Sequence, residues 1–132
     1  MANVIPYSFR GELFTGTHNF ASGGDAFKLA LYTASPYTTA STVYSATSEV
    51  SASGTAYTTT GNTLTGNAVA YGTAVATCDF ADTEWTSATF TAAFGAIYND
   101  DQSDKLCVVL DFGGNKTCTN GTFKITFPDP ST

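Results

Sequence analysis

Two stretches of period-two alternation constrain this chain more than any other feature of its sequence. In Phe27–Tyr32 and Thr122–Phe127, a large apolar residue occupies every second position. A β-strand places alternate side chains on opposite faces, so this pattern is typical of strands that bury one face in a core. The inward-facing residues predicted by this alternation are Phe27, Leu29, Leu31, Phe123, Ile125 and Phe127.

Turn-forming residues divide the rest of the second half into further short strands. The predicted strands are Ala68–Tyr71, Thr73–Phe80, Ala88–Tyr98 and Lys105–Phe112. The predicted connections are a tight reversal at Gly72 and hairpin turns at Asn99–Asp104 and Gly113–Lys116. The sequence therefore predicts an all-β domain, an antiparallel β-sandwich or small barrel of about six to eight strands.

The first twenty residues differ from the strand-rich remainder. Ser8 is placed to cap a short helix through Phe14 that Gly16 would end, although Gly11 weakens this helix and leaves a strand as an alternative. We expect residues 1–20 to form an N-terminal arm or short helix.

Residues 33–66 form an excursion that is rich in Thr and Ser and has no clear periodicity. Its isolated apolar residues are Tyr37, Tyr44, Val50, Tyr57 and Leu64. A structureless connection of this length is unusual in a compact domain. Either the excursion carries a strand or short helix, or a partner orders it. No repeat or linker indicates a second domain, so residues 1–132 are predicted to be a single domain.

The chain is poor in charge, with 5 basic and 11 acidic residues among 132 and a net charge of −6. Nucleic-acid binding is not expected, because counterion release needs a stripe of Lys and Arg. No apolar run is long enough for a membrane helix. Without a CxxC pair or signal-peptide features, Cys78, Cys107 and Cys118 are expected to be free thiols in a reducing cytosol, with Cys78 and Cys107 in the core.

Residues with catalytic or ligand-binding potential are few and poorly arranged for chemistry. His18 is the only histidine, and no Gly-x-Ser-x-Gly elbow accompanies it. Asp79, Asp82 and Glu84 precede Trp85, but a polar turn explains them better than a glycosidase pair. Asp100, Gln102 and Asp104 have the alternate spacing of a calcium loop, but Lys105 stands where its glycine would be, and a solvated hairpin turn is preferred. We therefore predict no enzymatic activity and no cofactor or metal site.

The order of several segments resembles a family of small structural proteins of tailed bacteriophages. The segments are Ser8–Phe14 with Gly16–Phe20, Phe27–Thr33, Tyr44–Val50, Trp85–Thr91, Ala96–Asn99 and Val109–Gly113. The resemblance implies a virion component, first of all a head decoration (cement) protein, with a tail or head–tail component as the alternative. It further implies a homotrimer that binds the major capsid protein on the capsid surface, assembled in the host bacterial cytoplasm.

Exposed aromatic and apolar residues outside the sheet are the expected partner contacts. The candidates are Phe9, Leu13, Phe14, Phe20, Tyr37, Tyr44 and Tyr57. Residues 1–20 either bind the partner or cap the domain's own core. An alternative function, a carbohydrate-binding or receptor-binding module, would use Trp85 and the loop tyrosines to stack on sugar rings.

Overall fold

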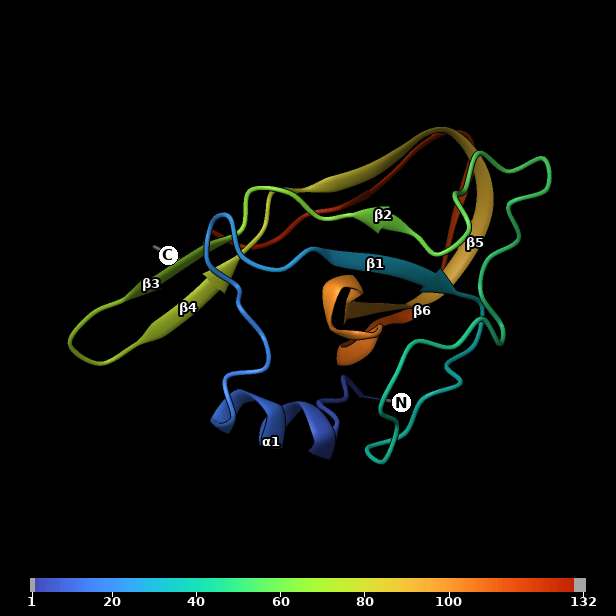
Figure 1. Cartoon of the computed structure of the whole chain (residues 1–132). Helices are drawn as coiled ribbons and strands as arrows, with labels where there is room; N and C mark the ends of the chain where they lie inside the picture. The colour runs from blue at the N-terminus through green and yellow to red at the C-terminus, as the bar shows by residue number, and fades with distance from the viewer. Residues whose placement is uncertain (1, 130–132) are drawn as a thin grey trace.

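A computed structural model describes residues 2–129, which form one short helix, six strands and a single 3-10 turn (Figure 1). The elements are α1 (Tyr7–Phe14), β1 (Phe27–Tyr32), β2 (Asn62–Thr63), β3 (Ala68–Tyr71), β4 (Ala76–Asp79), β5 (Thr83–Asn99), η1 (Asp100–Gln102) and β6 (Lys105–Ile125). The strands make two antiparallel sheets, and no closed barrel is present within the described range. The prediction of an all-β chain with a short N-terminal helix is confirmed.

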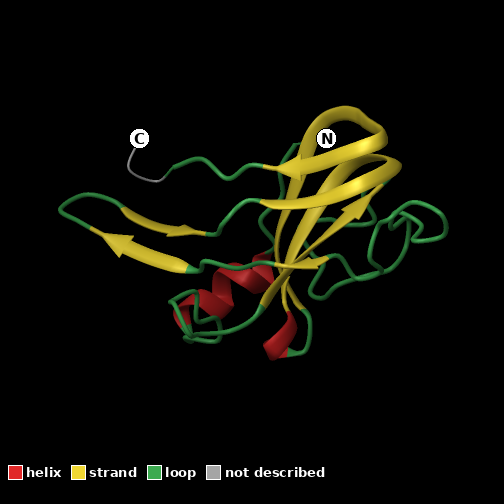
Figure 2. Cartoon of the chain, turned by 90° about the horizontal axis from the view of Figure 1, so that it is seen from above, coloured by secondary structure: helices red, strands yellow, loops and turns green. Residues whose placement is uncertain are grey.

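The larger sheet has the strand order β2-β1-β5-β6 and is built around the long β5–β6 hairpin. Strand β1 pairs with the second half of β5, from Phe27 opposite Asn99 to Tyr32 opposite Phe94. The first half of β5 and the end of β6 bend away from β1 and arch over the core (Figures 1 and 2).

The predicted turn at Gly113–Lys116 is wrong, because β6 continues through it as one strand. Ala92 pairs with Lys116 and Phe94 with Asp111, so four residues of β6 lie opposite Ala93 alone. Gly113 and Gly114 have φ values of 77° and 133°, which other residues adopt only with strain. Both turns and bulges use such backbone angles. Here the two glycines lie in a bulge of β6, opposite Ala93 of β5.

Both faces of β1 are buried, whereas the sequence predicted one. Phe27, Leu29 and Leu31 are fully buried on the predicted face, but Ala30 and Tyr32 on the other face are equally buried. Of the inward-facing residues predicted at the C-terminal end, Phe123 is buried, and Ile125 and Phe127 are half-buried and pack against the main core. The second face is covered by residues from the excursion and by Val4.

The excursion of residues 33–66 packs on its own domain, and of the two alternatives it shows the strand. It carries the short strand β2, and isolated bridges join Glu49 to Tyr32 and Val43 to Lys105. Gly61 lies so close to β1 that a Cβ at this position would overlap the carbonyl of Leu29. Only glycine fits this approach, which closes the excursion against the sheet edge.

Helix α1 begins one residue before Ser8 and is not capped by it. Pro6 is the N-cap residue, and the Ser8 hydroxyl donates instead to the carbonyl of Ser41. The predicted end is confirmed: Thr15 is the C-cap and Gly16 follows with φ of 69°. Ahead of the helix, Val4 exchanges two backbone hydrogen bonds with Val109 of β6.

Strands β3 and β4 form a separate two-stranded ribbon that projects away from the main sheet (Figures 1 and 2). The predicted reversal at Gly72 is confirmed, since the Gly72 N–H donates to the carbonyl of Val75 and closes the hairpin. We call residues 68–79 the β3–β4 arm. All four residues of β3 are exposed, whereas Thr77 and Asp79 of β4 are half-buried, so the rest of the chain covers the arm only in part.

Candidate functional site

The N-terminal candidates divide into two groups according to what their side chains touch. Phe20 stacks on Phe27 with ring centres 4.3 Å apart, and Phe9 meets Phe20 edge-on at 6.1 Å. These two rings are half-buried against the main core. In contrast, Leu13 is 49% and Phe14 93% exposed, so the outer end of α1 presents its apolar residues to solvent.

A buried polar network fixes α1 against the sheet. His18 Nε2 lies 2.7 Å from Glu12 Oε2, and its Nδ1 accepts a hydrogen bond from the Asn99 amide at 2.9 Å. The same amide donates to Asp25 Oδ2 at 2.8 Å. Because Asn99 donates to Nδ1, this pattern assigns the imidazole proton to Nε2, where it is donated to Glu12. His18 therefore meets a carboxylate and an amide rather than a serine or cysteine nucleophile.

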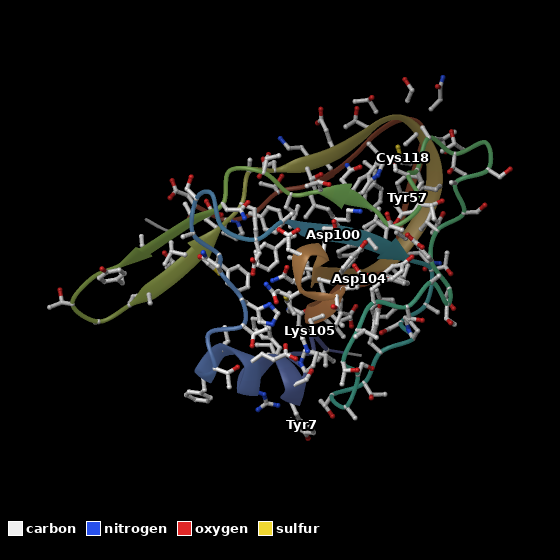
Figure 3. All side chains as sticks on the ribbon, in the orientation of Figure 1. Tyr7, Tyr57, Asp100, Asp104, Lys105 and Cys118 are labelled. Carbon is white, nitrogen blue, oxygen red and sulfur yellow. The ribbon has the colours of Figure 1, made fainter. Side chains whose placement is uncertain are left out.

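Electrostatics support the ionised form of both carboxylates in this network. Partial burial opposes the charge on Glu12, but hydrogen bonds from His18 and Lys105 outweigh it and lower the pKa of Glu12. Partial burial likewise opposes the charge on Asp25, and hydrogen bonds from the Asn19 backbone and the Asn99 side chain lower its pKa. Lys105 lies between α1 and the sheet (Figure 3), with its Nζ 3.1 Å from Glu12 Oε1.

An apolar groove separates α1 from the β3–β4 arm. Its outer part has a volume of about 310 Å³ and is lined by Phe9, Leu13, Phe20, Val69, Ala76, Thr77 and Cys78. A deeper part of about 270 Å³ shares Phe9, Phe20 and Cys78 and reaches toward the core. None of the side chains that line the outer part is charged. We call this hollow the α1–arm groove.

The β3–β4 arm adds exposed apolar residues that the sequence analysis did not select. Val69 is 48%, Val75 64% and Tyr71 85% exposed. The sequence analysis predicted these strands as part of a single sandwich or barrel, from the turn signals that bound them. An available signal was the absence of charge, since no Asp, Glu, Lys or Arg occurs between Asn67 and Cys78.

Two of the three excursion tyrosines expected as partner contacts, Tyr37 and Tyr57, are buried, and Tyr44 is half-buried. Tyr37 and Tyr57 are 4% and 3% exposed. Tyr57 and Tyr44 donate to the two carboxylate oxygens of Glu49 at 2.7 and 2.6 Å. Burial is the main cause that raises the pKa of both phenols, and the hydrogen bonds to Glu49 add to it. Tyr57 points from the excursion into the molecule (Figure 3).

Trp85 cannot serve as a sugar-stacking platform, because it is 3% exposed. Its ring lies among Tyr57, Phe90 and Phe123, with ring centres between 5.8 and 6.3 Å apart. Its indole N–H has no hydrogen-bond acceptor among the described residues. The carbohydrate-binding interpretation depended on exposed rings of Trp85 and the loop tyrosines, but Trp85, Tyr37 and Tyr57 are buried.

The acidic positions are used for structure. The predicted polar turn at Asp82–Glu84 is wrong, because Thr83 and Glu84 already belong to β5. Asp82 pairs with Lys124 at 3.1 Å and accepts a hydrogen bond from the Phe127 backbone, which lowers the pKa of Asp82. Asp100 begins η1, within the predicted connection to β6. Within residues 2–129, no group of three or more His, Cys, Asp or Glu side chains could hold a metal ion.

The cysteines occupy three different environments. Cys107 and Cys118 are buried, the latter near the bend of β5 and β6 (Figure 3). Cys78 is exposed on β4, which corrects the expectation that it lies in the core. Partial desolvation and the neighbouring Asp79 raise the pKa of the Cys78 thiol.

The helices in the described part of the chain are too short or too polar to cross a membrane. Comparison of the whole chain with protein-family models, curated proteins and solved structures finds no match.

Proposed function

We propose that the protein is a non-enzymatic virion structural subunit of a tailed bacteriophage. In this proposal it is a decoration (cement) protein that forms a homotrimer on the capsid surface and binds the major capsid protein. It is made in the host bacterial cytoplasm and needs no cofactor. The resemblance in segment order supports the phage assignment.

The observation that carries the proposal is a concentration of exposed apolar side chains on one side of the molecule. Leu13 of α1 and Val69 of the arm line the α1–arm groove, Phe14 follows at the end of α1, and Tyr71 and Val75 continue the exposed apolar residues along the arm. We call them together the apolar side. Contiguous exposed apolar surface marks interaction sites in soluble proteins. Low charge also reduces the desolvation cost of packing such a surface against a shell.

A cement protein acts through binding free energy alone. Each subunit that binds the assembled shell, and not its dissociated subunits, stabilises the shell by mass action. Repetition of weak contacts over a symmetric lattice increases the effect through multivalency. Such a role needs a rigid subunit with a surface that binds the shell. The buried hydrogen-bond networks favour rigidity, and the apolar side is the proposed binding surface.

Quantitative mass spectrometry of purified particles tests the proposal. We expect this protein in a simple fixed ratio to the major capsid protein. A copy number that matches a single tail ring would favour the tail or head–tail alternative, and absence from particles would contradict both.

A matched pair of variants tests the apolar side directly. Phe14→Ser removes an apolar group that is 93% exposed, and Val43→Ser removes one that is 47% exposed on the excursion. We expect Phe14→Ser to reduce binding to particles that lack the protein, with the melting temperature preserved, and Val43→Ser to bind like the natural protein. Equal binding of all three proteins would contradict the assignment of this side.

A further inference from the structure

We propose that the β3–β4 arm of one copy docks in the α1–arm groove of a second copy. This inference rests on the proposed role as an assembly subunit, because it specifies the contact through which copies of the chain associate. It names the second copy as the occupant of the groove.

The first argument is that the arm lacks support within its own chain. A two-stranded hairpin alone in water is marginally stable and needs packing on at least one face. Here the residues of β3 are all exposed, and those of β4 alternate between exposed and half-buried. The outer edges of β3 and β4 are also unpaired, because these strands pair only with each other. An exposed apolar ribbon of this kind is completed by contact with another chain.

The second argument is geometric. The groove runs along the arm from its base, where Val69 pairs with Cys78, to Ala76, which pairs with Tyr71. The tip, with Tyr71 and Val75, projects away from that base (Figures 1 and 2). The tip cannot enter its own groove unless the pairing of Val69 with Cys78 and of Tyr71 with Ala76 breaks. A second copy can present its tip to the groove without such a change.

The third argument is charge. Two copies with a net charge of −6 repel each other, so they can associate closely only where charge is absent. The arm has no charged residue from Ala68 to Cys78, and neither does the outer groove; Asp79, the last residue of the arm, lines only the deeper part. The tip of the arm and the outer part of the α1–arm groove are therefore both uncharged, and every copy of the chain carries both surfaces.

A projection that enters a groove elsewhere on an identical chain makes a head-to-tail contact. Such contacts close into rings when the rotation between neighbours permits it. In the proposed trimer, each copy would give one arm and receive one. The tip residues Tyr71 and Val75 would then be buried in the assembly, although they are exposed in the single chain.

Sedimentation velocity of the purified protein over the micromolar range tests this contact without any particle. We expect the natural protein to be an oligomer. Tyr71→Ser should raise the dissociation constant at least about tenfold, since buried tyrosines are among the strongest contributors to interfaces. Val43→Ser, which removes an exposed apolar group of the excursion rather than of the arm, should not change it. A monomeric natural protein, or equal association of both variants, would overturn the proposal.

A disulfide cross-link locates the contact. In the Val75→Cys variant under mild oxidation by a copper complex, the new thiol at the tip should link to Cys78 in the groove of the next copy. The linked band should disappear in the double variant Val75→Cys, Cys78→Ser. A link that persists in the double variant would mean tip-to-tip contact and would contradict the proposal.

The two proposals fail in different ways. An oligomer linked through Cys78 that is absent from particles would refute the virion role and leave the arm contact standing. Natural protein that decorates particles but is monomeric in sedimentation would refute the arm contact alone. A capsid protein cross-linked to the groove in place of a second copy would also refute the arm contact.

Discussion

Nε2 of His18 lies 2.7 Å from Oε2 of Glu12, and this contact joins helix α1 to the segment that leads into β1. The side chain of His18 is fully buried, and that of Glu12 is 15% exposed. Phe9 and Phe20 likewise pack against the domain's own core, whereas Leu13 and Phe14 at the outer end of α1 face solvent. Of the two roles left open for this segment, the packing supports capping of the core by Phe9 and Phe20, and the proposed partner contact uses only the outer end of α1.

Glu12→Ala is expected to destabilise the fold by about 1–3 kcal/mol, because it leaves the buried Nε2–H of His18 without an acceptor. Glu84→Ala is the matched control, since Glu84 is exposed on β5, and it should change stability by less than about 0.5 kcal/mol. Urea denaturation measures both. Equal stability of the two variants would contradict the structural role of the network.

Acid is expected to weaken the same network. The folded-state pKa of Glu12 lies below its ordinary value of 4.5, and that of Asp25 below 3.8. Their stabilising contribution is therefore present at higher pH and is lost as pH falls through the lowered values. The free energy of unfolding should decrease on acidification from about pH 6 to pH 3. Glu12→Gln should decrease less steeply, and an unchanged acid slope would show that Glu12 does not contribute.

Glu49→Ala is expected to destabilise the fold by at least about 2 kcal/mol, because charged hydrogen bonds to Tyr44, Tyr57 and the Thr60 backbone are lost together. Hydrogen exchange should show faster exchange across residues 44–60 than in the natural protein. Unchanged protection there would mean that packing alone orders the excursion.

Two substitutions at Trp85 should distinguish the contribution of its ring volume to stability from the contribution of its indole N–H. Trp85→Ala is expected to cost about 3–5 kcal/mol, as for other buried aromatics. Trp85→Phe removes an indole N–H that has no acceptor within residues 2–129, and should cost less than half as much. Calorimetry provides the comparison. A similar loss of stability in both variants would indicate that the N–H donates a hydrogen bond, for example to a buried water.

Thiol labelling should distinguish the cysteines. Cys78 is exposed, whereas Cys107 and Cys118 are buried, so one thiol per chain should react under native conditions. Because the pKa of Cys78 is raised, its rate should be low at neutral pH and should increase as pH approaches the raised value. A reductant should leave the melting temperature unchanged, since all three cysteines are free. Reaction of Cys107 or Cys118 before unfolding would contradict these burial assignments.

The sequence was sufficient to predict strands, the short helix and one face of the core. Period-two alternation correctly identified Phe27, Leu29 and Leu31. It could not reveal that the excursion would cover the opposite face of β1, because that cover depends on hydrogen bonds between residues far apart in sequence. Gly113 and Gly114 could not distinguish a bulge from a turn, since both structures use the same backbone angles.

Prediction of the partner surface was less successful, for a related reason. Aromatic residues in polar loops resemble contact residues, yet Tyr37 and Tyr57 are buried in the molecule that carries them. Conversely, the residues of the arm have the alternation of a core strand but are exposed. Periodicity reports which residues share a face, and only the tertiary fold determines whether that face is covered.

The pairing of β1 with the end of β5 also constrains how the chain acquires its fold during synthesis. Phe27 lies opposite Asn99, so β1 leaves the ribosome long before its partner exists. Until then, the apolar side chains of β1 have no sheet to join, while β5 and β6 can form their hairpin from adjacent sequence. Folding should therefore begin in the second half of the chain, and the nascent N-terminal half is the part most exposed to aggregation and chaperone binding.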